Sequence, residues 1–227
     1  MNVSYLIQLL LQAFALIVGI VVHESSHALA AWVLGDQTAR ARGRVSLNPL
    51  NHIDPFGTVI LPLIMIAAGG PVFAYAKPVP VYLGNLKHPK RDEVIISLAG
   101  PASNLLLAGL AALVMRLALP RLLYSSVSTA AVYYFYYGCL YFMSVNLSLA
   151  FFNLIPLPPL DGSKVLVLFL KGRALETYHQ IQRYAMPILL VVLYILPELL
   201  NIDLVGWYFD LTMYPLLELL LNFGLGW

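Results

Sequence analysis

Long apolar stretches recur along most of the chain and restrict it to a small class of folds. Of the 227 residues, 60% are hydrophobic and 11% are charged. An ordinary globular domain carries about 25% charged residues, so this chain has too few charges to cover a soluble surface of its size. Stretches of about 20 apolar residues are long enough to cross a bilayer as helices. The sequence therefore predicts an all-α, polytopic membrane protein.

Five apolar stretches are predicted to span the membrane: residues 5–34, 92–119, 130–152, 181–200 and 204–223. A further apolar stretch, 56–75, is interrupted by two internal prolines and a Gly-Gly pair. Irregular backbone at membrane depth is tolerated only where protein or water satisfies its polar groups. We therefore expect 56–75 to be a broken or re-entrant element, and to be a sixth span if it crosses. No internal repeat or long polar stretch is present, so residues 1–227 are expected to form a single integral-membrane domain.

The distribution of Lys and Arg predicts the orientation. Suppose that the first helix enters from outside and that 56–75 returns on the side from which it enters. All of the thirteen Lys and Arg residues except Arg116 and Arg121 are then cytoplasmic, as expected from the excess of these residues in cytoplasmic loops. The N-terminus would be outside and the C-terminus cytoplasmic. Residues 1–4 carry no Lys or Arg, so we expect the first helix to be retained and not removed as a signal peptide.

His23-Glu24-Ser25-Ser26-His27 is an H-E-x-x-H motif within the first predicted span. The i, i+4 spacing puts both imidazoles on one helix face, where they can hold a zinc ion, and Glu24 can act on water that the metal activates. A Glu within a spanning helix is expensive, and ionisable groups at membrane depth are functional by default. This cost argues against the alternative, a pair of buried structural histidines.

A catalytic zinc needs a third protein ligand and keeps its fourth position for water. The candidates are Asp161, His52, His88 and the pair Glu176 and His179. Asp161 follows a proline-rich stretch after the span 130–152, and the predicted topology brings it to the same cytoplasmic half as His23 and His27. An Asp-Gly pair is also common in plain turns. For His52, which lies in a polar loop, a loop or supporting role is the preferred interpretation.

Three motifs together resemble the signatures of the site-2 protease family of intramembrane zinc metalloproteases. They are His23-Glu24-x-x-His27, Gly100-Pro101-x-x-Asn104 and Asn153-x-x-Pro156-x-Pro158-x-x-Asp161-Gly162. The segments Asn48-Pro49-Leu50 and His52-Ile53-Asp54-Pro55 are similar to the short prokaryotic branch of that family. We expect neither a PDZ nor a CBS domain in this chain.

The resemblance implies a function and a role for each motif residue. The ligands of a single zinc ion would be His23, His27 and Asp161. Glu24 would be the catalytic base, Asn104 would stabilise the oxyanion and Asn153 would contact the substrate. The chain would be an intramembrane zinc endopeptidase of a prokaryotic cell membrane that cleaves transmembrane segments of protein substrates, as in regulated intramembrane proteolysis. Its partners would be that substrate and the lipid bilayer, since the basic residues are too scattered to indicate nucleic acid.

The residues also leave alternative interpretations open. Asn104 can form a structural hydrogen bond between helices, and Asn153 can cap a broken helix. A second E-x-x-H pair at Glu176 and His179 suggests half of a di-iron carboxylate site, although such a site also needs a Glu from each of two further helices. A zinc transporter could use the same two histidines and aspartate as a midplane site, but it gives no reason for Glu24.

Overall fold

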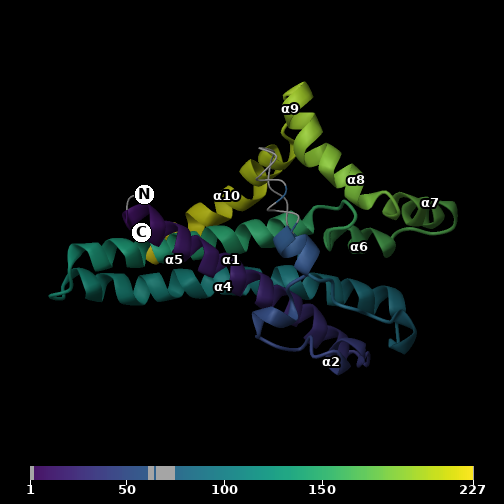
Figure 1. The fold of residues 1–227 in the computed structure, drawn as a ribbon, viewed down its shortest axis with the longest axis horizontal. Helices are drawn as coiled ribbons and strands as arrows, with labels where there is room; N and C mark the ends of the chain where they lie inside the picture. Colours follow the sequence, from purple (N-terminus) through teal and green to yellow (C-terminus); the bar gives the residue numbers. More distant parts are fainter. Residues whose placement is uncertain (1–2, 61–63, 65–74, 227) are drawn as a thin grey trace. The chain divides into compact units, whose positions relative to one another are not determined.

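The computed structural model describes residues 3–60, 64 and 75–226, and within these residues all regular structure is helical (Figure 1). Within this described part, four helices are long and apolar enough to cross a membrane: α1 (Val3–Val33), α4 (Pro89–Leu123), α5 (Thr129–Leu154) and α10 (Leu204–Leu225). The prediction of an all-α, polytopic membrane protein is confirmed. The stretch 56–75 lies mostly outside the described residues; its beginning belongs to the π-helical turn η2 (Pro55–Ile60).

The fourth predicted span, 181–200, starts later than expected. It is built from α8 (Ala185–Leu190), η4 (Val191–Ile195) and α9 (Leu196–Leu200). The preceding helix α7 (Arg173–Gln182) is bent by 74° from Ala185–Leu200. The residues 181–184 that we assigned to the start of the span therefore belong to the end of α7 and to the break, because the polar residues of α7 favour a separate short helix. The described residues thus contain four candidate spans, or five if this bent pair is one span, in agreement with the expected five.

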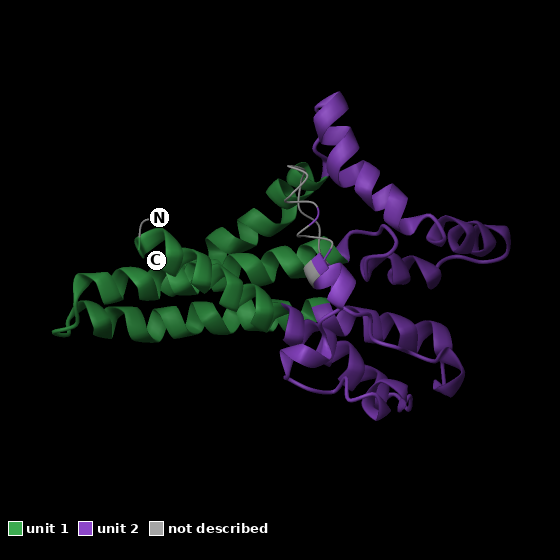
Figure 2. Cartoon of the chain, in the orientation of Figure 1, with its two compact units in different colours: residues 1–19, 101–153, 205–227 green, residues 20–100, 154–204 purple. Residues whose placement is uncertain are grey.

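The chain folds into two compact units, each assembled from separate pieces of sequence (Figure 2). The first unit consists of residues 1–19, 101–153 and 205–227, and the second of residues 20–100 and 154–204. In the first unit, Met115 of α4 and Met143 of α5 are fully buried in an apolar cluster. A second apolar cluster joins Leu147 of α5 to Met213 of α10. Helix packing through apolar side chains thus holds the first unit together.

The second unit contains two long loops and the short elements α2 (Thr38–Ala41), η1 (Pro49–Asn51), η3 (Leu83–Asn85) and α6 (Gly162–Val167). The guanidinium of Arg44 is buried and donates to the backbone carbonyls of Asn51, Lys77 and, at 2.9 Å, Pro78. Because one side chain bonds both segments, it fastens the loop after α1 to the stretch 75–82.

Asp36 is a second residue that links the same two loops through hydrogen bonds. Its fully buried carboxylate accepts hydrogen bonds from the Thr38 hydroxyl (2.5 Å), the Tyr82 backbone N–H (2.7 Å) and the Asn85 amide (2.8 Å). Burial raises the pKa of the Asp36 carboxyl, but these hydrogen bonds outweigh burial and hold the pKa below its ordinary value. Asp36 is therefore a charged anchor for the loop that precedes α4.

Candidate metal centre

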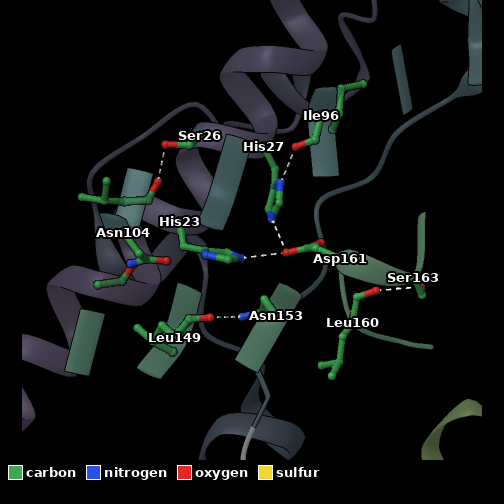
Figure 3. Close-up of polar contacts among 12 residues, drawn as sticks. His23, Ser26, His27, Ile96, Asn104, Leu149, Asn153, Leu160, Asp161 and Ser163 are labelled. Carbon is green, nitrogen blue, oxygen red and sulfur yellow. Dashed lines mark hydrogen bonds and ion pairs between the residues drawn. The ribbon is translucent and has the colours of Figure 1, made fainter. Parts of the chain in front are cut away.

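His23 and His27 lie one turn apart on α1, and both side chains are buried. Their rings meet edge to face, with centroids 4.6 Å apart. The Nε2 atoms point toward one carboxylate oxygen, Oδ2 of Asp161, at 3.1 Å from His23 and 3.3 Å from His27 (Figure 3). The helical i, i+4 spacing thus directs two ring nitrogens at the same point.

Asp161 reaches this point because the chain leaves its helix before it. The helix α5 ends at Leu154, and the prolines at 156, 158 and 159 occupy the stretch before α6. Gly162 then packs so closely on the backbone of Leu154 that any Cβ there would overlap the Leu154 carbonyl. The turn is closed by the Ser163 hydroxyl, which donates to the carbonyl of Leu160 at 2.7 Å. Asp161 is therefore presented from a tight turn beside α1.

The three side chains fit a zinc ion. Their ligand atoms all lie within 4.8 Å of one another, and theirs is the one group of metal-binding type within the described part of the chain. A tetrahedral zinc with bonds of about 2.0–2.1 Å separates its ligand atoms by about 3.3 Å. The two N···O separations, 3.1 and 3.3 Å, are close to that value. Two neutral imidazoles and one carboxylate also form a donor set that catalytic zinc uses.

The space in front of the histidines depends on Gly100 of α4. A Cβ at this position would lie 2.5 Å from His27 Nε2 and 2.6 Å from His23 Nε2. These are the nitrogens that face Asp161, so a larger residue would occupy the place of the metal. The sequence indicated Gly100 only as part of the Gly100-Pro101-x-x-Asn104 motif, whereas the structure places it directly beside the ligand atoms.

Glu24 is half-buried on α1 next to His23. Among the described residues, no side chain donates a hydrogen bond to its carboxylate. Arg44 is one source of opposite charge near Glu24. Burial lowers the pKa of the Arg44 guanidinium, and the negative charge of Glu24 offsets part of that effect. The Glu24 carboxylate thus has no side-chain hydrogen-bond donor among the described residues and can accept a proton.

The other candidate ligands lie elsewhere. His52 is buried, but its Nε2 donates to the backbone carbonyl of Ser46 at 2.7 Å. His88 is exposed in the loop before α4, and Glu176 and His179 are exposed on α7. Within the described residues, none of these four belongs to the metal-binding group. The second E-x-x-H pair therefore does not join the first in a common cluster, as a di-iron site would require.

Asn104 and Asn153 belong to the first unit, whereas the three candidate ligands belong to the second. Asn104 is fully buried, and its amide donates to Gly19 O at 3.0 Å and to Asn146 Oδ1 at 2.9 Å. The amide of Asn153 donates to Leu149 O at 2.9 Å, one turn back in α5. Both protons of the Asn104 amide are therefore used between helices, so an oxyanion contact would require one of these bonds to break.

Two residues of these networks did not emerge from the sequence analysis. Asn146 is fully buried within α5, and a lone amide inside an apolar span is a usable signal for a buried partner. The carbonyl of Ile96 accepts a hydrogen bond from His27 Nδ1 at 2.7 Å (Figure 3). That contact is made by the backbone, so no residue type could have indicated it.

Known proteins resemble the chain over most of its length. The family model described as peptidase family M50 matches residues 119–196, a range that contains Asp161. The protein “Putative zinc metalloprotease YwhC” of Bacillus subtilis is 41% identical over 66% of this chain and 65% of its own length. “Putative zinc metalloprotease Rip2” of Mycolicibacterium smegmatis is 33% identical over 84% of this chain and 70% of its own length. The chain thus spans slightly less than two thirds of YwhC.

A third relative, named like the second, comes from Mycobacterium tuberculosis and is 30% identical over 86% of this chain and 71% of its own length. No solved structure matches the chain significantly. The names of all three relatives specify zinc, in agreement with a donor set of two histidines and an aspartate. The chain therefore belongs to peptidase family M50, the site-2 protease family of zinc metalloproteases.

Proposed function

We propose that this chain is an intramembrane zinc endopeptidase that cuts transmembrane segments of protein substrates. The observation that carries the proposal is the convergence of His23 Nε2 and His27 Nε2 on one oxygen of Asp161, at 3.1 and 3.3 Å. These residues would hold the zinc ion, and their protein neighbours leave Glu24 without a hydrogen-bond donor among the described residues. A metal site with a free carboxylate beside it is the arrangement that peptide hydrolysis requires.

Each residue has a separate task in the proposed reaction. Zinc, when bound, acidifies water and polarises the carbonyl of the scissile peptide. Glu24 takes the proton of the attacking water and passes it to the leaving amide nitrogen. The Ile96 carbonyl fixes the proton of His27 on Nδ1, so the opposite nitrogen keeps a lone pair for the metal. Gly100 leaves room for the substrate and the metal together.

Asn104 and Asn153 complete the proposal as residues that contact the substrate. Asn104 would stabilise the oxyanion after one of its two amide bonds exchanges for the substrate oxygen. Asn153 lies at the end of α5, where its amide has only an intrahelical acceptor, so exchanging that bond for a substrate carbonyl costs little. Replacing either residue with Ala should slow cleavage without changing zinc content.

The proposed substrate is a helix within the bilayer. Its backbone amides are already bonded along the helix, so the segment must unwind locally before an extended peptide reaches the zinc. With the N-terminus outside and the C-terminus cytoplasmic, the site would lie in the cytoplasmic half of a prokaryotic cell membrane.

Purified protein in vesicles tests the proposal. Elemental analysis should find one zinc per chain, and a reconstituted model transmembrane substrate should be cut within its apolar segment. Iron at two ions per chain would instead support a di-iron enzyme. Zinc flux into the vesicles without cleavage of any transmembrane substrate would support a transporter and overturn the proposal.

A further inference from the structure

An ion pair joins the segment that carries Asp161 to the helix that supports His27. The ammonium of Lys164 lies 3.1 Å from the Glu93 carboxylate, and both side chains are mostly buried, with 24% and 20% of their surface exposed. Lys164 belongs to α6 and Glu93 to the first turns of α4. Both residues belong to the second unit, so the pair is a contact within one compact body.

One end of this pair lies one turn from Asp161, and the other end lies one turn from the backbone carbonyl that orients His27. The backbone N–H of Lys164 donates to the carbonyl of Asp161 at 3.0 Å. Glu93 precedes Ile96 by three residues in α4, and the Ile96 carbonyl receives the Nδ1 proton of His27. The ion pair therefore links the turn of the third ligand to the helical turn that orients the second ligand.

Partial burial makes this pair different from an ordinary surface ion pair. Exposed pairs contribute little to stability, whereas loss of one partner from a buried pair leaves an uncompensated charge. The neighbouring pair, Arg91 with Asp92, provides a comparison in the same turn of α4. Its Arg side chain is 61% exposed, and its N···O distance is 2.9 Å; its Asp side chain is 1% exposed but also accepts a hydrogen bond from the His88 backbone N–H. The Arg91 pair is confined to adjacent residues, so it links no second segment.

We propose that Lys164 and Glu93 are positioning residues that hold Asp161 at the distance from His27 that zinc binding requires. The inference rests on the proposed function, because it takes His23, His27 and Asp161 as the zinc ligands. The inference adds one structural requirement for zinc binding to that function. The carboxylate of Asp161 must be held against α4 as well as against α1.

The direction in which zinc affinity changes distinguishes a positioning role from a purely electrostatic one. If Lys164 acted only through its charge, its removal would take a cation away from zinc and strengthen binding. Removal of the Glu93 charge would then weaken binding. Positioning predicts that both changes weaken binding, because either one releases the Asp161 turn.

The test measures the zinc dissociation constant of the full chain in detergent, by competition with a coloured chelator. Glu93→Gln and Lys164→Met should each bind zinc about 10- to 100-fold more weakly, the usual cost of losing a group that supports a ligand. The reversed pair, Glu93→Lys with Lys164→Glu, restores the link and should recover most of this loss. Arg91→Met is the matched control and should bind zinc within about twofold of the wild type. Thermal unfolding of each metal-free variant shows whether the fold is kept.

Three results would overturn the inference. Lys164→Met could bind zinc as tightly as the wild type or more tightly, the reversed pair could bind no better than the single variants, or Arg91→Met could weaken binding as much as Lys164→Met. Asp161→Ala is measured beside them. If it loses zinc while the ion-pair variants do not, the inference fails and the proposed function stands. If Asp161→Ala keeps its zinc, the ligand assignment itself fails.

Discussion

The Nδ1 atom of His27 lies 2.7 Å from the backbone carbonyl oxygen of Ile96, on the opposite side of the ring from Asp161. A carbonyl oxygen can only accept a hydrogen bond, so Nδ1 carries a ring proton and Nε2 is the nitrogen whose lone pair a bound zinc ion would use. A second helix thus supplies no ligand but determines which nitrogen of His27 can bind. The backbone of α4 therefore helps to determine which nitrogen of His27 is available to a metal ion.

Asp161→Ala should remove most of the bound zinc, whereas His52→Ala should leave it in place. Asp161 supplies the oxygen on which both Nε2 atoms converge. His52 instead donates to Ser46 O and lies 3.3 Å from the Ser25 hydroxyl. Zinc content per chain after gel filtration measures both variants. An empty site in His52→Ala together with a full site in Asp161→Ala would reverse the assignment.

Gly100→Ala should weaken zinc binding by at least about 10-fold, although the change is a single methyl group. The added Cβ would lie 2.5 Å from His27 Nε2, and the helix backbone leaves it no other direction. Gly109→Ala on the same helix is the matched control, because a Cβ there meets nothing within 4 Å. In a helix that control should stabilise the protein by about 0.5–1 kcal/mol. Equal zinc affinity in the two variants would contradict the close approach at Gly100.

Local sequence patterns predicted those features that depend on neighbours along the chain. The i, i+4 spacing of His23 and His27 was sufficient to place both rings on one face, and apolar length was sufficient for α1 and α5. The break before Ala185 was missed, because residues 181–184 were counted with the apolar stretch that follows them, whereas residues 181 and 182 end the polar helix α7. Mean hydropathy along a stretch of sequence does not detect such a bend between two helices.

Contacts between distant segments could not be predicted in this way. Arg44 was treated as one of the basic loop residues that determine orientation, and the structure buries it among three backbone carbonyls. The pair of Lys164 with Glu93 joins residues that lie far apart in the sequence. Neither contact has a characteristic spacing, because each depends on which backbone the fold brings beside it.

Asp36→Asn should lower the unfolding temperature at neutral pH by a few degrees. Hydrogen bonds hold the folded pKa of Asp36 below its unfolded value near 3.8. A lowered carboxyl pKa contributes stability that is present above the unfolded pKa and is lost as pH falls through the folded pKa. The difference from the wild type should therefore shrink below about pH 4. Thermal unfolding at several pH values measures it. The exposed Glu198→Gln is the control, and a difference independent of pH would refute the charged anchor.

The N-terminus should lie outside the cell, and the loops 36–55 and 77–91 should both be cytoplasmic. The prediction follows from the positions of Lys and Arg, of which only Arg116 and Arg121 fall on the outer side. Lys87→Cys in a Cys139→Ser background should react with an impermeant thiol reagent only in inside-out vesicles, and Arg121→Cys only in right-side-out vesicles. Reaction of Lys87→Cys from the outer face would mean that the stretch 56–75 crosses the membrane.

Glu24→Gln should abolish cleavage and keep the zinc. Glu24 lies about 100° round the helix from His23, so we expect its carboxylate to act on the attacking water and not to be a ligand of the metal. Gln preserves size and hydrogen bonding but cannot take the proton, and loss of a general base typically costs about 10²- to 10⁴-fold in rate. Bound metal and cleavage of a transmembrane substrate are measured on the same preparation. Glu176→Gln, the same change at an exposed site on α7, should match the wild type in both. A Glu24→Gln protein that binds zinc and still cuts at the wild-type rate would exclude the proposed mechanism.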